Sequence, residues 1–214
     1  MANRFNVLQT SQSVKQSKEE LERRMKPPDI GEDEHQLQYP YTLWFSPKRK
    51  IKNVSSYDDL IQAVVSFSSV EQFWHIYSYL LRPSSLPNCD LLLFKCNIRP
   101  IWEDAENSDG GKWIIRIRKG LLDRYWENLI LAVMGEQFIV GDQICGVVVS
   151  VRTQFGIVSV WNKTAADKVV VDRIKETLQR VLQLPQNTIM EYKPHYECLK
   201  DHSSYKNTST VQVH

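Results

Sequence analysis

Cysteine is scarce and irregularly spaced in this chain. Four cysteines occur in 214 residues, with no CxxC pair among them. This density is too low for a disulfide-rich scaffold. We interpret the four as reduced thiols of a cytosolic or nuclear protein, and Cys145, which lies in an apolar run, as a small core residue.

Long apolar runs and a strong net charge are also missing. No segment approaches the roughly 18–20 apolar residues that span a bilayer, and the N-terminus lacks the apolar stretch of a signal peptide. The formal net charge is +2, too weak a field for long stretches of nucleic acid. We therefore expect a cytoplasmic protein with no membrane partner, whose nucleic-acid contacts are local.

Catalytic motifs are absent as well. The sequence has no HExxH, no nucleophile elbow and no glycine-rich phosphate loop. Glu103 and Asp104 are adjacent, and adjacent acids rarely share one hydrolytic geometry. We predict that the protein is not an enzyme and that it has no catalytic residue, metal or other cofactor.

The composition is that of one soluble globular domain with two tails, at 42% hydrophobic and 24% charged residues. Residues 1–34 are polar and charge-rich, and predict a flexible tail in which a helix over 17–25 has no periodic apolar face to bury. The domain is expected at 35–205, and 206–214 form a loose C-terminal tail in a Ser/Thr/Asn-rich stretch.

Periodicity predicts an α+β fold. Clusters of β-branched and aromatic residues mark strands at 39–45, 91–96, 112–118, 144–153, 156–162 and 188–193. Helical spacing marks 70–81, 123–138 and 171–182, with Ser68 or Ser69 and Asp123 as candidate caps. A short turn near 154–156 favours an antiparallel sheet with helices packed on one face.

Trp102 carries the strongest positive signal. It follows Pro100-Ile101 and precedes Glu103, at the start of a loop ending in Gly110-Gly111. One interpretation is a core Trp beside a solvated acid. The other is a binding site, because an indole face attracts flat or cationic ligands and a carboxylate accepts their N–H groups.

Arg152 and Trp161 form a second candidate pair. Their spacing suits a hairpin, which predicts that both reach one end of the sheet. They are either a surface Arg and a half-buried Trp, or a phosphate ligand and part of a ring site. With Trp102-Glu103 they suggest a binder of a flat, cationic, anion-tailed molecule, a description that a methylated guanine nucleotide fits.

The helical stretches carry a third candidate. Aromatics at helical spacing are usually core, yet two helices that each expose a Trp or Leu form a groove for a partner helix. The residues in question are Val70, Trp74, Trp126, Glu127 and Leu131.

Several segments resemble the mRNA cap-binding translation initiation factor 4E family, over about 35–205. They are RPIWED (99–104), GGKWIIRIR (110–118), WENLILAVMG (126–135), CGVVVSVR (145–152) and VWNKT (160–164). The phrases GEQFIVGD (135–142) and NTIMEYK (187–193) are most similar to the 4E homologous protein subgroup. The resemblance implies a curved antiparallel sheet of about eight strands, backed by three α-helices on its convex face.

The resemblance also implies a cap site on the concave face. The 7-methylguanosine base would lie between the rings of Trp102 and Tyr57, with Glu103 accepting its N–H donors and Trp161 against the methyl group. Arg152 would hold a phosphate, with Lys112 and Lys200 adding to phosphate binding. The family's general factor has Trp at the position of Tyr57 and a second basic residue at that of Ile157, so we expect weaker cap affinity here.

On the helical face, the resemblance implies a groove for short helices that bear a Tyr and a Leu-plus-apolar pair. The matching positions are Val70, Trp74 and Leu131, with His35 at the approach, although Gln36 replaces the usual Pro after it. Glu127 stands where the general factor has an apolar residue, which predicts weaker binding of the 4G scaffold.

The resemblance favours a repressor of translation. The chain would occupy the capped 5′ end of selected mRNAs and compete with the general factor. Its partners would be 4E-binding proteins and GYF-domain proteins, with weak or no 4G binding. Two alternatives stay open: a general initiation factor that recruits 4G, and a protein-interaction scaffold with a weak cap pocket. An enzyme acting on nucleotides is a more remote third.

Overall fold

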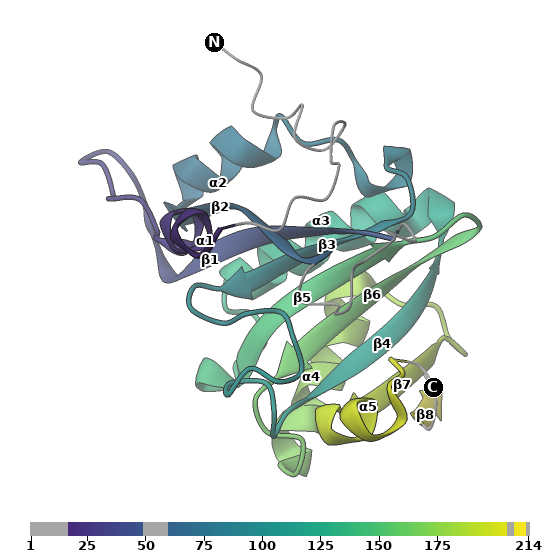
Figure 1. Ribbon diagram of the computed structural model, residues 1–214. Coiled ribbons are helices and arrows are strands. Elements are labelled where there is room, and N and C mark those ends of the chain that lie inside the picture. The colour runs from purple at the N-terminus through teal and green to yellow at the C-terminus, as the bar shows by residue number, and fades with distance from the viewer. Residues whose placement is uncertain (1–16, 49–59, 205–207, 213–214) are drawn as a thin grey trace.

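The protein is built on one eight-stranded antiparallel sheet (Figure 1). The computed structural model describes residues 17–48, 60–204 and 208–212. The strands are β1 (Gln36–Pro47), β2 (Gln62–Ser69), β3 (Cys89–Lys95), β4 (Gly111–Arg118), β5 (Ile144–Val151), β6 (Phe155–Asn162), β7 (Ile189–Pro194) and β8 (Ser209–Gln212). Their order is β2-β1-β3-β5-β6-β4-β7-β8, and every neighbouring pair is antiparallel.

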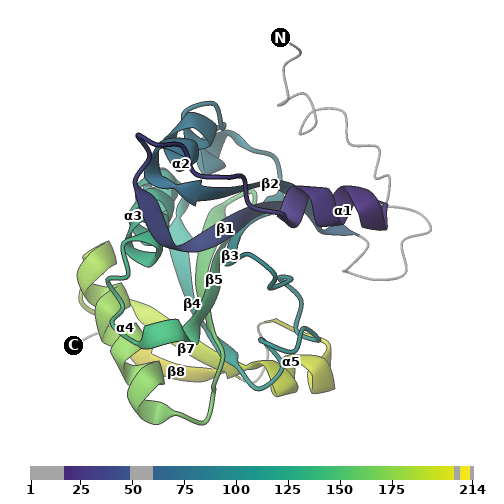
Figure 2. The same ribbon diagram turned by 90° about the vertical axis from the view of Figure 1, so that its left-hand side faces the viewer.

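The two faces of the curved sheet are covered differently. Helices α2 (Val70–Tyr77), α3 (Leu122–Met134) and α4 (Lys168–Leu182) lie on one side, and the short α1 (Lys18–Met25) and α5 (His195–Asp201) lie on the other (Figure 2). The larger apolar core lies under α2, α3 and α4. A smaller cluster on the opposite, concave face contains Trp44, Phe94 and Trp161. The predicted fold, with three helices on one face, is confirmed, and α1 and α5 are additional.

The resemblance implied about eight strands, which is confirmed, but sequence periodicity located only six of them and missed β2 and β8. β2 runs directly into α2 without a Gly or Pro between them. The residues that usually mark the end of a strand in a sequence are therefore lacking. β8 is Ser/Thr-rich, yet it pairs with β7 along Ile189↔Gln212 to Tyr192↔Ser209. The expectation of a loose C-terminus is therefore wrong for residues 209–212.

Helix starts follow local capping chemistry in two of three cases. Ser69 caps α2 by accepting a hydrogen bond from the Gln72 N–H at 3.1 Å, as expected. Asp167 caps α4, which therefore begins earlier than predicted. Asp123 is not a cap, because α3 starts at Leu122 and the Asp123 carboxylate instead accepts from the backbone N–H and hydroxyl of Ser84.

Part of the segment predicted as a flexible tail packs on the domain. Ser17 caps α1, and Leu21 and Met25 contact the concave cluster. The Arg24 guanidinium donates to the backbone oxygens of Ala63 and Val64 at the edge of the sheet. The spacing of Leu21 and Met25 therefore supplies the small apolar face that the sequence analysis judged absent. No helix among the described residues has the length and apolar character to cross a bilayer.

Candidate functional site

The loop between β3 and β4 places Trp102 over the concave face. The buried Asn107 stabilises this loop from within. Its side-chain Nδ2 donates to the carbonyl oxygens of Arg99 and Ile101, both at 2.8 Å. The Asp104 carboxylate accepts from the backbone N–H groups of Arg99 and Glu106, both at 3.0 Å. Trp102 is half-buried against the concave cluster, so its predicted place in a loop is confirmed.

Glu103 and Asp104 have separate environments although they are adjacent. The Asp104 carboxylate accepts hydrogen bonds from the backbone of its own loop, whereas Glu103 is exposed beside Trp102. A solvated carboxylate next to an indole face retains its acceptor capacity for a ligand. The two adjacent acids therefore differ: Asp104 stabilises the loop, and Glu103 is exposed to solvent.

Lys112 lies between two indoles. It is the register partner of Trp161 across β4 and β6, and its side chain is 4% exposed. Its ammonium nitrogen is 5.4 Å from the ring centroid of Trp102 and 5.4 Å from that of Trp161. Both distances are within the range of a cation–π contact, so the two indoles already converge on one cation.

Burial dominates the electrostatics at this point. Desolvation lowers the pKa of Lys112 to about 8. His195 is fully buried, and its ring centroid is 4.3 Å from that of Trp161. Among the described residues, neither of its ring nitrogens has a hydrogen-bond partner. Burial, assisted by the charge of Lys112, holds the pKa of His195 well below its ordinary value. A neutral imidazole and a buried lysine with a lowered pKa therefore lie next to Trp161.

Arg152 lies at the other end of β5. Trp161 pairs with Gly146, whereas the N–H of Arg152 donates to Phe155 at the hairpin turn. The prediction that both residues reach one end of the sheet is wrong, because the turn is short and Trp161 lies far along β6. β5 has 8 residues and a strand rises about 3.3 Å per residue, so Trp161 and Arg152 mark two ends of an elongated site.

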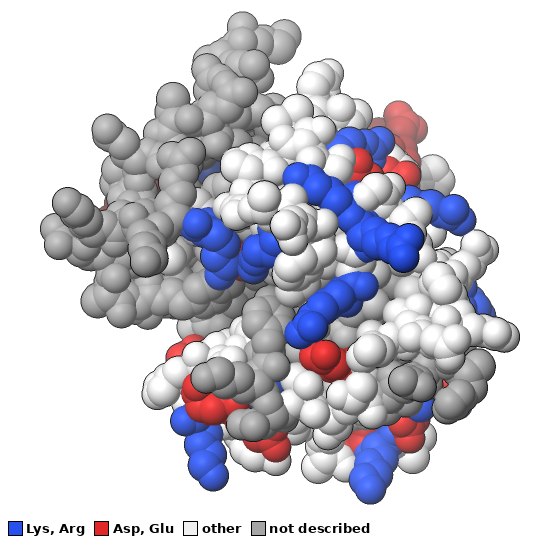
Figure 3. Space-filling view, turned by 90° about the vertical axis from the view of Figure 1, so that its right-hand side faces the viewer, with Lys and Arg blue, Asp and Glu red and all other residues white. Residues whose placement is uncertain are grey.

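The Arg152 end holds a cation pair that the sequence analysis missed. The Arg152 guanidinium contacts the buried carboxylate of Asp90 at 2.9 Å, and the Lys48 ammonium contacts the same carboxylate at 3.0 Å. Among the described residues, this cluster brings two cations to one carboxylate, an arrangement that suits an additional anion such as phosphate. The sequence feature that could have identified Asp90 is an acidic residue directly before the apolar run of β3. Lys and Arg side chains also gather across the middle of the face in Figure 3.

Two of the predicted cap-binding residues, Lys200 and Tyr57, are not among the contacts described above. Lys200 is exposed on α5, on the same side of the sheet as α1 (Figure 2). Tyr57 lies outside the described residues. Their roles stay predictions. In the described ranges, no group of three or more His, Cys, Asp or Glu side chains is positioned to hold a metal ion.

A separate groove lies on the helical side. It has a volume of about 180 Å³ and is lined by Leu37, Val70, Phe73, Trp74, Leu131, Met134 and Gly135. Trp74 is 44% exposed there although it is a large apolar residue, which is typical of an interaction surface. The structure thus brings together three predicted partner residues, Val70, Trp74 and Leu131.

The other groove candidates lie elsewhere. His35 is at the approach, where its ring and backbone N–H both contact Glu71 at 2.7 Å. Glu127 is not among the residues that line the groove, and its carboxylate pairs with Arg82. Trp126 is 2% exposed and belongs to the core, so its interpretation as a groove residue is wrong.

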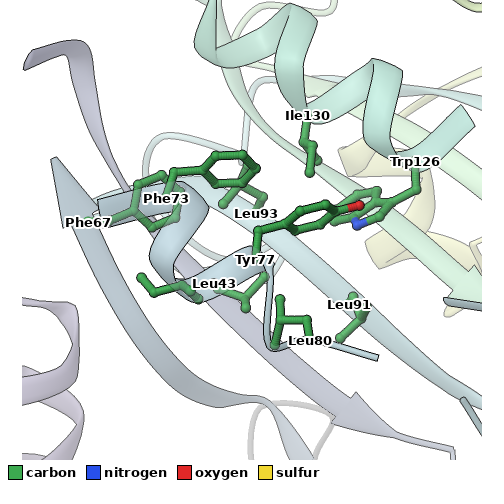
Figure 4. Close-up of a pocket in the computed structure, with 10 residues that line it drawn as sticks. Leu43, Phe67, Phe73, Tyr77, Leu80, Leu91, Leu93, Trp126 and Ile130 are labelled. Atoms are coloured by element: carbon green, nitrogen blue, oxygen red, sulfur yellow. The ribbon is translucent and has the colours of Figure 1, made fainter. Parts of the chain in front are cut away.

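Trp126 lines an internal cavity instead, which Figure 4 shows between α2, α3 and the sheet. The cavity has a volume of about 20 Å³. Its walls are apolar, with Phe73 and Tyr77 from α2 facing Ile130 and Trp126 from α3. A void of this size and character is a packing imperfection and not a ligand site.

Sequence comparisons point to one family. Residues 36–210 match the family described as eukaryotic initiation factor 4E. Eukaryotic translation initiation factor 4E-4 of Caenorhabditis elegans is 48% identical over 203 residues, which cover 94% of this chain and 95% of that protein. Eukaryotic translation initiation factor NCBP of Oryza sativa subsp. japonica is 46% identical over 191 residues, 89% of this chain and 83% of that protein.

Solved structures agree with the sequence matches. The complex of C. elegans eIF4E-3 with the 4E-binding protein Mextli and cap analog has a TM-score of 0.74 at 36% identity, and the match covers 83% of this chain and 99% of that one. Ascaris suum eIF4E-3 with an m2,2,7G cap has a TM-score of 0.74 at 33% identity, covering 83% and 98%. The family resemblance seen in the sequence is confirmed. Higher identity to 4E-4 and NCBP than to Drosophila melanogaster 4E1, at 34%, supports the subgroup.

Proposed function

The chain belongs to the eukaryotic initiation factor 4E family, and from this premise we propose that it binds the 7-methylguanosine 5′ cap of mRNA and represses translation. The observation that carries the cap proposal is the convergence of Trp102 and Trp161 on one cation, the Lys112 ammonium, 5.4 Å from each ring. A site that accommodates a lysine cation between two indoles has the electrostatics that a cationic base requires.

Methylation at N7 gives guanine a positive charge, which an indole face attracts. The charge–ring contact contributes about 0.5–2 kcal/mol per ring. The exposed carboxylate of Glu103, next to Trp102, would accept hydrogen bonds from the base N1–H and exocyclic amine, worth roughly 1.5–3 kcal/mol. An unmethylated guanine keeps the second contribution and loses the first, so the site would discriminate by charge.

The phosphate chain would run from the indoles toward Arg152. That path follows the concave side of β5, and ends at the Lys48–Asp90–Arg152 cluster. Ile157 is buried on β6 between Ser150 of β5 and Arg116 of β4, so position 157 itself supplies no cation to the path. Weaker cap affinity than that of the general factor therefore remains our prediction, although Lys48 adds a cation that the sequence analysis did not consider.

Repression would arise from occupancy of the cap combined with partner choice at the groove. Val70, Trp74 and Leu131 line a surface of the right character for a helix with Tyr and Leu anchors, and the related eIF4E-3 of C. elegans is bound to the 4E-binding protein Mextli. We propose 4E-binding proteins and GYF-domain proteins as partners in the cytoplasm. Glu127 pairs with Arg82 and does not line the groove, so the proposal of weak 4G binding depends on the acid at position 127, where the general factor has an apolar residue.

Titration with a cap analogue, followed by Trp fluorescence, tests the first half of the proposal. Stacking should quench emission in the wild type and much less in Trp102→Ala. Retention on a cap-analogue resin after washing with unmethylated GTP would exclude a scaffold with a weak pocket. Absence of quenching in the wild type would overturn cap binding.

A 4G peptide pull-down tests the second half. We expect weak capture compared with a 4E-binding-protein peptide. Tight, Trp74-dependent capture of 4G would instead favour a general initiation factor.

A further inference from the structure

Resting on the proposed function, we propose that Lys112 fills the base site of the free protein with its own ammonium and moves to the ligand's phosphate when a capped nucleotide binds. Lys112 would therefore have two positions. In the first it stands in for the cationic base, and in the second it neutralises the phosphate. This exchange makes the site select a base and a phosphate together.

The geometry of the free protein supports the first position. Lys112 and Trp161 are register partners on neighbouring strands, so their side chains leave the same face of the sheet. The ammonium is equally distant from both ring centroids, at 5.4 Å. A base that contacts both Trp102 and Trp161 would compete with this ammonium for the space between the two rings.

Burial disfavours the charged form of Lys112 in that position. The ionisable groups that influence Lys112 are Cys198, Lys193, Asp90 and Lys48, together with the nearby His195. Asp90 already contacts Lys48 and Arg152, and Lys193 contacts Asp201 at 2.6 Å. Burial penalises the charged form more than these neighbours favour it, as the lowered pKa of Lys112 shows.

The second position follows from charge balance. A ligand with a cationic base takes over the contacts with the indoles, and an attached phosphate offers the displaced ammonium an anion. A methylated nucleoside also displaces Lys112 but offers it no anion. Lys112 therefore weakens the binding of methylated nucleosides and strengthens the binding of methylated nucleotides.

A Lys112→Met variant separates this exchange from simple phosphate binding. Methionine keeps the length of the side chain and removes the charge. If the exchange operates, the variant binds 7-methylguanosine about tenfold more tightly than the wild type, the equivalent of two modest ring contacts, and binds 7-methylguanosine triphosphate more weakly. Unchanged nucleoside affinity would overturn the exchange and leave Lys112 as a phosphate ligand only. Lys168→Met, on the exposed start of α4 across the sheet, is the matched charge control and should change neither affinity.

Nuclear magnetic resonance of protein labelled with ¹³Cε-lysine tests the position directly. Ring currents from two indoles should shift one lysine ε-methylene signal upfield in the free wild type, and Lys112→Met should lack that signal. Saturation with 7-methylguanosine triphosphate should return the signal to the ordinary range. Binding with the signal unmoved would overturn the exchange alone, and so would a free protein without a shifted signal. No binding to the wild type, seen as unchanged Trp fluorescence, would overturn the proposed function together with the exchange.

Discussion

Arg152 donates to Asp90 across 2.9 Å, and the Asp90 carboxylate is buried. The same carboxylate contacts Lys48 at 3.0 Å, so one internal anion positions two cations. An Arg fixed in this way is preorganised for phosphate, because its planar fork is already oriented when the ligand arrives.

Lys48→Gln tests whether the second cation of this cluster contributes to phosphate binding. We expect affinity for 7-methylguanosine triphosphate to fall about three- to tenfold, the value of one partly solvated charge-assisted contact. Affinity for 7-methylguanosine should not change. Fluorescence titrations at two salt concentrations provide the measurement, with Lys168→Gln as a control of equal charge. Equal losses for nucleoside and nucleotide would show that Lys48 acts on folding and not on phosphate.

Asn107 is the residue on which the position of Trp102 depends. Asn107→Asp removes two amide donors from the carbonyls of Arg99 and Ile101 and brings a carboxylate against them. We expect a loss of about 2–4 kcal/mol in the free energy of unfolding, measured by urea denaturation, and weaker cap quenching. Ser108→Ala, which removes an exposed hydroxyl contact at 3.3 Å, should cost less than about 0.5 kcal/mol. A variant Asn107→Asp as stable as the wild type would contradict this account of the loop.

Trp74 and Trp126 provide a matched comparison on the helical side. Trp74 is exposed at the groove and packs by its edge on Phe73, with ring centroids 5.0 Å apart, whereas Trp126 is core. Trp74→Ala should abolish capture of a Tyr/Leu-motif helix with a stability loss of about 1 kcal/mol or less. Trp126→Ala should lower the free energy of unfolding by about 3–5 kcal/mol. Peptide binding by calorimetry, alongside denaturation, distinguishes them; undiminished capture by Trp74→Ala would exclude this groove as the docking surface.

The fold was largely predictable because burial leaves a periodic trace in the sequence. Alternation at the end of β4 and along β6, the Val-rich run of β5, and helical spacing along α3 and α4 are the traces of burial in this sequence. β8 left no such trace, because an edge strand is specified by backbone pairing with β7 and not by an apolar face.

The site was predictable only where a residue's chemistry is unusual for its surroundings. Trp102 in a polar loop and Arg152 after a Val-rich strand are of this kind. Lys48 and Asn107 are ordinary in sequence, and their roles appear only when the fold brings Lys48 to Asp90 and closes the loop around Asn107. The mutual approach of Lys112 and the two indoles likewise depends on tertiary structure.

The buried Lys112 predicts a specific pH dependence of stability. Its pKa is about 8 in the folded protein and ordinarily 10.5, so between these values the unfolded chain binds more protons than the folded one. The free energy of unfolding should therefore rise with pH across this window. The cost of the buried ammonium, on the order of 3 kcal/mol, is fully present below pH 8 and is lost above about pH 10.5.

Comparison with Lys112→Met isolates this group from the other residues that titrate in alkali. The neighbouring Cys198 also titrates in alkali, because burial raises the pKa of its thiol in the folded protein, but it is present in both proteins and its contribution largely cancels in the comparison. Methionine also adds apolar burial, but that gain does not depend on pH, so the informative quantity is the change in the stability difference. Urea denaturation at pH 7.5 should show the variant more stable by that cost plus the apolar gain. By pH 9.5 the pH-dependent part should shrink to roughly half, as the linkage relation requires. A stability difference that stays constant over this interval would mean that Lys112 keeps an ordinary pKa, and that its ammonium is better solvated between the indoles than its burial indicates.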